Sequence, residues 1–195
     1  MLNKNPILVL VAGLASAAVP ALAQENSRQD FAVQASGSFV TSTTQNGIRN
    51  NANDNAGVLG TYRFFFGTHH GLEADYGYGQ NTQNYTGLPG VETHTHEISG
   101  AYVFRMPMGK VTPFALAGVS ALVFDPQSFA GASSQTRAGF VYGVGADISL
   151  TSHVFARAEY RGFLYNSPTY NLPQLAGIDR LTHRAEPSVG FGYRF

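Results

Sequence analysis

The chain has 195 residues, of which 44% are hydrophobic, 12% aromatic and only 12% charged, with 22 Gly and no Cys. This length suits one domain. Soluble globular proteins carry about 25% charged residues, so the composition argues against an ordinary cytoplasmic enzyme. The formal net charge of zero argues against a nucleic-acid partner, because nucleic-acid-binding domains carry a basic excess. The absence of Cys excludes thiol catalysis, thiolate metal sites and disulfides.

Residues 1–23 have the organisation of a secretory signal peptide. Lys4 precedes an apolar run over 7–19, and residues 21–23 read Ala-Leu-Ala, which fits the A-x-A pattern of a cleavage site. We expect cleavage after this tripeptide and a mature domain of residues 24–195. A retained membrane anchor is the alternative, but the apolar run is shorter than the roughly 20 residues that a spanning helix needs.

The rest of the chain alternates between apolar and polar residues with period 2, which is the pattern of β-strands. In chain order, the expected strands cover residues 31–39, 58–66, 72–78, 97–105, 114–124, 140–149, 154–164 and 184–195. In the fifth of these strands we expect Phe114, Leu116, Leu122 and Phe124 on the apolar face, opposite the alanines between them.

The connectors between these strands alternate in length. Those over 42–55, 80–92, 125–136 and 166–180 are long and rich in Asn, Gln, Thr, Gly and Pro, whereas those over 67–70, 106–110 and 151–153 are short. Long loops at one end and tight turns at the other predict an all-β fold, an eight-stranded antiparallel up-and-down β-barrel with both termini at the turn end.

The side chains of the two faces indicate which face is inside. Nearly all strand aromatics fall on the apolar face, the exceptions being Phe65, Phe155 and Phe163. The lumen of an eight-stranded barrel is just wide enough to be filled by side chains. This number of aromatic rings would therefore overfill it. We therefore expect the apolar face to point outward into lipid, as in transmembrane barrels. The alternative is a soluble sandwich whose core these rings would form.

Aromatic residues near the strand ends are expected to form girdles at the two membrane interfaces. These residues are Phe39, Tyr62, Phe66, Tyr78, Phe104, Phe124, Tyr193 and Phe195.

The polar face carries six arginines and six carboxylates. Unpaired charges in a narrow lumen are costly, so this balance predicts an internal network of ion pairs that fills the barrel and leaves no continuous pore. The predicted network comprises Arg63, Glu73, Asp75, Glu97, Arg105, Asp147, Arg157, Glu159, Arg161, Arg184, Glu186 and Arg194. A narrow gated channel is the alternative.

Several stretches resemble the small outer-membrane β-barrel family that includes the OmpA transmembrane domain and the "outer membrane protein beta-barrel" proteins of Gram-negative bacteria. They lie at residues 71–78, 113–118, 143–147, 157–161 and 191–195. The resemblance implies an outer-membrane location, with membrane lipid as the surroundings. It also implies that Phe191, Tyr193 and Phe195 form a C-terminal signal for the barrel assembly machinery. OmpA continues into a peptidoglycan-binding domain, whereas this sequence stops at Phe195, so we do not expect cell-wall tethering.

Catalytic and metal-binding interpretations are weaker. His94 and His96 share a face at a spacing that could hold a metal, but a pair of interfacial histidines is the favoured interpretation. Glu73 and Asp75 are expected to pair with arginines rather than act as catalytic acids. The His-x-Ser-Asn stretch of lipid A deacylases is absent, since His96 is followed by Glu-Ile and His183 by Arg-Ala.

The sequence therefore predicts a non-enzymatic, monomeric barrel that contributes to envelope structure and presents its loops outside the cell, with no cofactor and no metal. A surface adhesin that binds a host factor or another extracellular ligand through the long loops is the first alternative. A lipid A modifying enzyme that uses an outward histidine is the second.

Overall fold

The computed structural model describes residues 28–45, 48–52, 55–85, 90–127, 133–169 and 181–195. Within these ranges the chain forms ten strands joined in a single sheet. The same ranges contain no helix that is long and apolar enough to cross a membrane. The predicted signal peptide lies outside the described residues.

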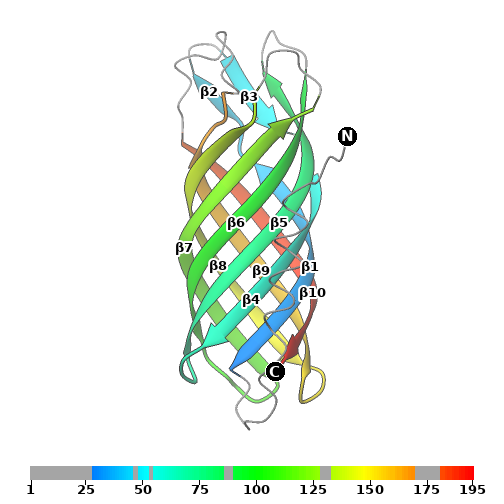
Figure 1. The fold of residues 1–195 in the computed structure, drawn as a ribbon, viewed down its shortest axis with the longest axis vertical. Helices are drawn as coiled ribbons and strands as arrows, with labels where there is room; N and C mark the ends of the chain where they lie inside the picture. Colours follow the sequence, from blue (N-terminus) through cyan, green and yellow to red (C-terminus); the bar gives the residue numbers. More distant parts are fainter. Residues whose placement is uncertain (1–27, 46–47, 53–54, 86–89, 128–132, 170–180) are drawn as a thin grey trace, which may run out of the picture.

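Eight long strands form a closed antiparallel barrel (Figure 1). Each pairs with the next along the chain, and β10 pairs with β1 to close the ring. The strands are β1 (Gln29–Val40), β4 (Asn55–Phe65), β5 (His70–Tyr85), β6 (Val91–Arg105), β7 (Val111–Pro126), β8 (Gln135–Ser149), β9 (Val154–Asn166) and β10 (Leu181–Arg194). The predicted eight-stranded up-and-down barrel is confirmed.

The barrel has two unlike ends. Three short turns join β4 to β5, β6 to β7 and β8 to β9 at the lower end of Figure 1, where β1 also begins and β10 ends. We call this the turn end and the opposite one the loop end. A short hairpin of β2 (Thr43–Gln45) and β3 (Ile48–Ala52) lies at the loop end and pairs with the last residues of β5.

The strands at the loop end are longer than the sequence pattern indicated. Most of the connector expected over 80–92 is strand, because β5 and β6 stay paired as far as Gln83 and Val91. The alternation of apolar and polar residues disappears in this region, but the backbone hydrogen bonds of the ladder continue without it. Hydropathy therefore marked the apolar part of these strands and not their ends.

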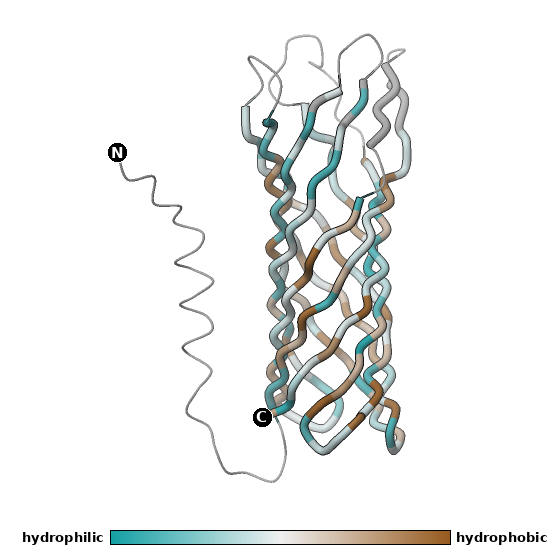
Figure 2. Tube along the Cα trace, turned by 90° about the vertical axis from the view of Figure 1, so that its right-hand side faces the viewer, coloured by the Kyte–Doolittle hydropathy of each residue, from teal (hydrophilic) through white to brown (hydrophobic). Residues whose placement is uncertain are grey.

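The outer face of the barrel wall is apolar. Val119 is 70% exposed and Phe191 is 66% exposed, and similar side chains project from all eight barrel strands. Figure 2 shows hydrophobic residues recurring along the wall, with mostly hydrophilic or neutral residues near the loop end. Such a band is what a barrel needs where its outer surface meets lipid. The predicted girdle residues lie on this outer face, with one exception on β7.

The orientation of β7 differs from the prediction. Phe114, Leu116, Leu122 and Phe124 are buried inside the barrel, and the alanines between them face outward. Directly opposed residues of neighbouring strands share a face. Phe114 lies opposite Arg105 and Gly145, which both face the lumen, so Phe114 faces the lumen as well. Because side chains alternate along a strand, this one position fixes the orientation of the whole of β7. Both faces of β7 are apolar, and hydropathy alone did not distinguish them.

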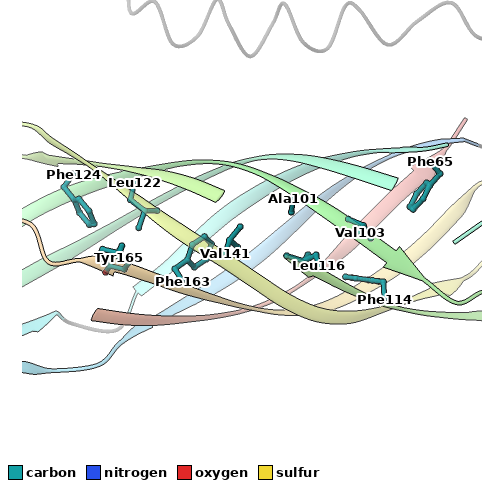
Figure 3. Packing of buried hydrophobic residues seen from close by; sticks show 10 residues of the cluster. All are labelled: Phe65, Ala101, Val103, Phe114, Leu116, Leu122, Phe124, Val141, Phe163 and Tyr165. Carbon is teal, nitrogen blue, oxygen red and sulfur yellow. The ribbon is translucent and has the colours of Figure 1, made fainter. Parts of the chain in front are cut away.

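The lumen consequently has an apolar wall as well as a polar one. Ten buried hydrophobic side chains from β4 and from β6 to β9 form a single cluster. Figure 3 shows them spread along the length of the barrel, from Phe124 and Tyr165 near one end to Phe65 near the other. The predicted lumen contained only small and charged residues, apart from Phe65, Phe155 and Phe163, which do face inward.

Candidate functional site

The charged interior is the candidate functional site. The strand alternation turns every second residue of β1, β4, β5, β6, β8, β9 and β10 into the lumen, and this set contains the predicted charges. Ten of them are buried, whereas Arg105 and Arg194 are partly exposed. The buried ones are Arg63, Glu73, Asp75, Glu97, Asp147, Arg157, Glu159, Arg161, Arg184 and Glu186.

One group of ion pairs lies toward the turn end, and we call it the turn-end cluster. Arg157 is at its centre: Nε donates to Asp147 Oδ1 at 2.7 Å and Nη2 to Asp147 Oδ2 at 3.0 Å. The same guanidinium contacts Thr61 Oγ1 at 2.9 Å and Asp30 Oδ1 at 3.2 Å. The cluster comprises Arg63, Arg157 and Arg194 with Asp30, Glu73, Asp147 and Glu159.

A second group, the loop-end cluster, lies nearer the loops. Arg161 Nη2 contacts Asp75 at 3.2 Å and Glu97 at 2.9 Å. Arg184 Nη2 contacts both Glu97 and Glu186, the latter at 2.8 Å. The cluster comprises Arg161 and Arg184 with Asp75, Glu97 and Glu186.

Phenylalanine rings hold several arginines in place. The Arg63 guanidinium lies 3.9 Å from the centre of the Phe114 ring, and that of Arg184 lies 4.3 Å from Phe163. Cations attract the faces of aromatic rings, so these contacts stabilise charges and also exclude water from them. The inward position of Phe114 therefore belongs to the charged site, which sequence reasoning missed when it placed this ring in lipid.

Small residues make room for these rings. A Cβ added to Gly145 would lie 2.5 Å from Phe114 Cζ, and one added to Gly192 would lie 2.2 Å from Phe155 Cζ. Real Cβ atoms do not approach a neighbour so closely. The inward glycines of β8 and β10 therefore leave the space that the inward rings of the adjacent strands occupy.

Two lumen charges were not predicted, and one predicted charge lies apart. Asp30 is 1% exposed and pairs with Arg157, although the expected first strand began one residue later. Arg137 lies opposite the inward Leu122 and so faces the lumen near the loop end. Arg105 sits at the turn end, with its guanidinium 3.4 Å from the centre of the Phe65 ring and its Nε donating to the Thr68 carbonyl. The described lumen residues thus remain balanced, now with seven acids and seven arginines.

A small cavity adjoins the loop-end cluster. This cavity of about 30 Å³ is lined by polar residues such as Asn81, Thr95 and Glu186 and by the rings of Phe124 and Tyr165. This is room for one or two water molecules.

The other predicted residues lie on the outer surface. His94 and His96 face outward, and their Nδ1 atoms lie 3.3 Å from Tyr78 Oη and 2.8 Å from Tyr76 Oη. No group of three or more His, Cys, Asp or Glu side chains in the described ranges is placed to hold a metal ion. Phe191, Tyr193 and Phe195 also face outward, at the turn end.

Known proteins match the chain in sequence and in fold. The family model described as "Outer membrane protein beta-barrel domain" matches residues 8–195. A 25 kDa outer-membrane immunogenic protein of Brucella canis is 25% identical over 126 residues, which are 65% of this chain and 58% of that protein. The chain therefore spans little more than half the length of this relative.

Solved structures share the barrel. Neisserial surface protein A has a TM-score of 0.62 at 16% identity, covering 85% of this chain and 97% of that one. The attachment invasion locus protein Ail of Yersinia pestis has a TM-score of 0.54 at 17% identity, covering 86% and 97%. At these identities the likeness shows the fold. Because the family model matches nearly the whole chain, the chain belongs to the outer membrane protein β-barrel family and resides in the outer membrane of a Gram-negative bacterium.

Proposed function

We propose that the protein is a non-enzymatic envelope barrel whose lumen is closed by the turn-end and loop-end clusters. The observation that carries this proposal is the burial of eleven charged side chains, joined by ion pairs that cross the lumen between strands far apart in the sequence. Arg184 and Glu97, for example, lie on β10 and β6, which are opposite each other in the ring of eight strands. These contacts link opposite parts of the wall, so they favour a role in folding and closure.

Solute uptake by reconstituted vesicles tests the closed lumen. Vesicles that contain the refolded protein should swell in isotonic arabinose no faster than protein-free vesicles, because the lumen offers no continuous path for a hydrated sugar. A general porin refolded by the same procedure is the positive control. Swelling at a porin-like rate would contradict the proposal.

The non-enzymatic part of the proposal is supported by the chemistry of the interior. The buried carboxylates contact arginines, which favours ion pairing over acid–base chemistry. Lipid A is the substrate that an outward histidine would reach. Its acylation pattern, measured by mass spectrometry, should be identical in a deletion strain and its parent, and a change in acyl-chain number would support an enzyme instead.

Surface recognition is the second candidate function. At the loop end the sheet continues through the β2–β3 hairpin and its pairing with β5, which gives an extended platform beyond the apolar band. Ail, which shares the fold, is an attachment invasion locus protein by name. Replacing residues 43–52 by a two-residue turn should abolish binding of cells to immobilised extracellular-matrix proteins if this surface recognises them. Unchanged binding would remove the support for adhesion.

We further propose that residues 1–23 are removed on export, that the C-terminal aromatic residues direct assembly, and that the barrel is a monomer. Export is supported by the outer-membrane location, and N-terminal sequencing of the membrane protein should begin at Gln24. A sequence that begins at Met1 would show that the leader is retained.

A further inference from the structure

Exposed basic side chains gather at the turn end of the barrel. At the turn end, Arg28, His69, His70, Lys110 and His153 are all exposed. Among the described residues, the acidic side chains outside the lumen are Glu92 and Asp125, which lie near the loop end of β6 and β7. In outer-membrane barrels the short turns face the periplasm. The basic residues therefore lie at the level of the periplasmic leaflet, with no exposed acidic side chain described beside them.

Backbone hydrogen bonds arrange these bases in a ring around the turn end. The Arg105 amide donates to the His69 carbonyl, and the Ser149 amide donates to the Lys110 carbonyl. On the other side, the Arg194 amide donates to the His153 carbonyl. The ring is completed beside β1, where the Phe65 amide donates to Arg28 and the Phe195 amide to Gln29.

Two lumen-facing arginines lie just inside this ring. Arg194 Nη1 donates to Ser149 Oγ at 3.0 Å, and its Nη2 lies 3.5 Å from Asp147. Arg105 Nε donates to the carbonyl of Thr68. Both side chains are partly exposed at the mouth of the lumen and are not part of the outward ring of bases.

Aromatic rings flank the ring of bases. His70 packs against Tyr102 and Phe104 with ring centres 5.9 and 5.4 Å apart, and His153 stacks on Tyr193 at 5.5 Å. These aromatic side chains are between 38% and 46% exposed. Aromatic rings at this depth sit at the headgroup level, where the glycerol backbone and phosphate of a lipid are found.

We propose that this turn-end rim binds the phosphate groups of anionic phospholipids in the periplasmic leaflet. Guanidinium, ammonium and imidazole N–H groups donate hydrogen bonds to phosphate oxygens, and basic pockets at a membrane surface bind anionic headgroups. The rim is defined as Arg28, His69, His70, Lys110 and His153. This inference is independent of whether the lumen is closed.

Competition between lipids in vesicles tests the rim. The full mature protein is refolded into phosphatidylcholine vesicles that contain 10% phosphatidylglycerol as a chosen composition, and spin-labelled lipids of both classes report occupancy of the first lipid shell. The test variant combines Arg28→Gln, His69→Gln, Lys110→Gln and His153→Gln. The matched control, His94→Gln with His96→Gln and His183→Gln, removes imidazoles from the loop end. Heat-modifiable gel migration verifies that every variant is folded.

The wild type and the loop-end control should prefer phosphatidylglycerol, and the rim variant should lose that preference by roughly fivefold or more, since each base near an anionic surface contributes about 1 kcal/mol. Equal occupancy by the two lipids in the wild type, or an equal loss in the control, would overturn the proposal. Complete displacement of the labelled phosphatidylglycerol by inorganic phosphate at equal concentration would assign the rim to free phosphate, and would overturn it too.

Discussion

The two ion-pair clusters in the lumen use the same residue types in different ways. In the turn-end cluster, Arg157 engages Asp147 through two nitrogens and uses a third for Thr61. In the loop-end cluster, Arg184 contacts both Glu97 and Glu186 through a single nitrogen, beside the small cavity described above. The bidentate Arg157–Asp147 pair is geometrically fixed and buried, whereas a pair next to a cavity can exchange a lost contact for water. The turn-end cluster should therefore stabilise the fold more strongly.

The largest expected effect follows from breaking the turn-end cluster. Arg157→Ala leaves the buried Asp30 and Asp147 without their main partner and should lower the free energy of unfolding by about 3–5 kcal/mol. Urea unfolding of the barrel in lipid vesicles, followed by circular dichroism, measures the change. If Arg157→Ala lost less stability than Arg184→Ala in the same vesicles, the loop-end cluster would be the more stabilising of the two, contrary to this account.

A smaller effect should come from the packing that supports the turn-end cluster. Gly145→Ala places a Cβ 2.5 Å from Phe114, whose ring lies under Arg63, and should cost about 2 kcal/mol through overpacking. The same unfolding experiment measures it. Gly60→Ala is the matched control, because its Cβ would meet its nearest neighbour at 3.8 Å, and it should change stability little. Equal costs at the two sites would contradict the proposed packing.

Removing an arginine from the loop-end cluster should cost less. Arg184→Ala leaves Glu97 with Arg161, and water in the adjoining cavity can solvate Glu186. The expected loss is about 1 kcal/mol, at the low end for a buried group that loses its partner. If the variant loses as much stability as Arg157→Ala, the cavity does not admit compensating water.

The smallest effect is expected at the mouth of the turn end. Arg105 is partly exposed and its guanidinium stacks on Phe65, so Arg105→Gln should cost about 0.5 kcal/mol. Differential measurement against the wild type in the same vesicles would detect it. A cost above that of Arg184→Ala would show that Arg105 takes part in the turn-end cluster.

The sequence predicted the barrel because its alternation is strong on seven strands, where one face is charged or small and the other is aromatic. It oriented β7 wrongly, since Phe114 and the alanines that alternate with it are all apolar and only the register with Arg105 and Gly145 determines the face. Asp30 was missed because it lies at the very start of β1, where little alternation precedes it.

The composition of the charged interior was easier to predict than its organisation. Strand parity placed the charges in the lumen, but the division into two clusters depends on which strands face each other across the barrel. Glu97 of β6 thus contacts Arg184 of β10, a pairing that spans 87 residues and crosses the lumen. Such choices follow from the stagger of the closed barrel, which periodicity alone does not contain.

Planar-bilayer recording tests the central claim of a closed lumen most directly. The refolded wild-type barrel, inserted in a phosphatidylcholine bilayer at neutral pH, should show no stable conductance above the baseline, because the two clusters and the inward rings occupy the lumen. Long-lived openings with a large and uniform unitary conductance would show a continuous water-filled path, and would contradict the account.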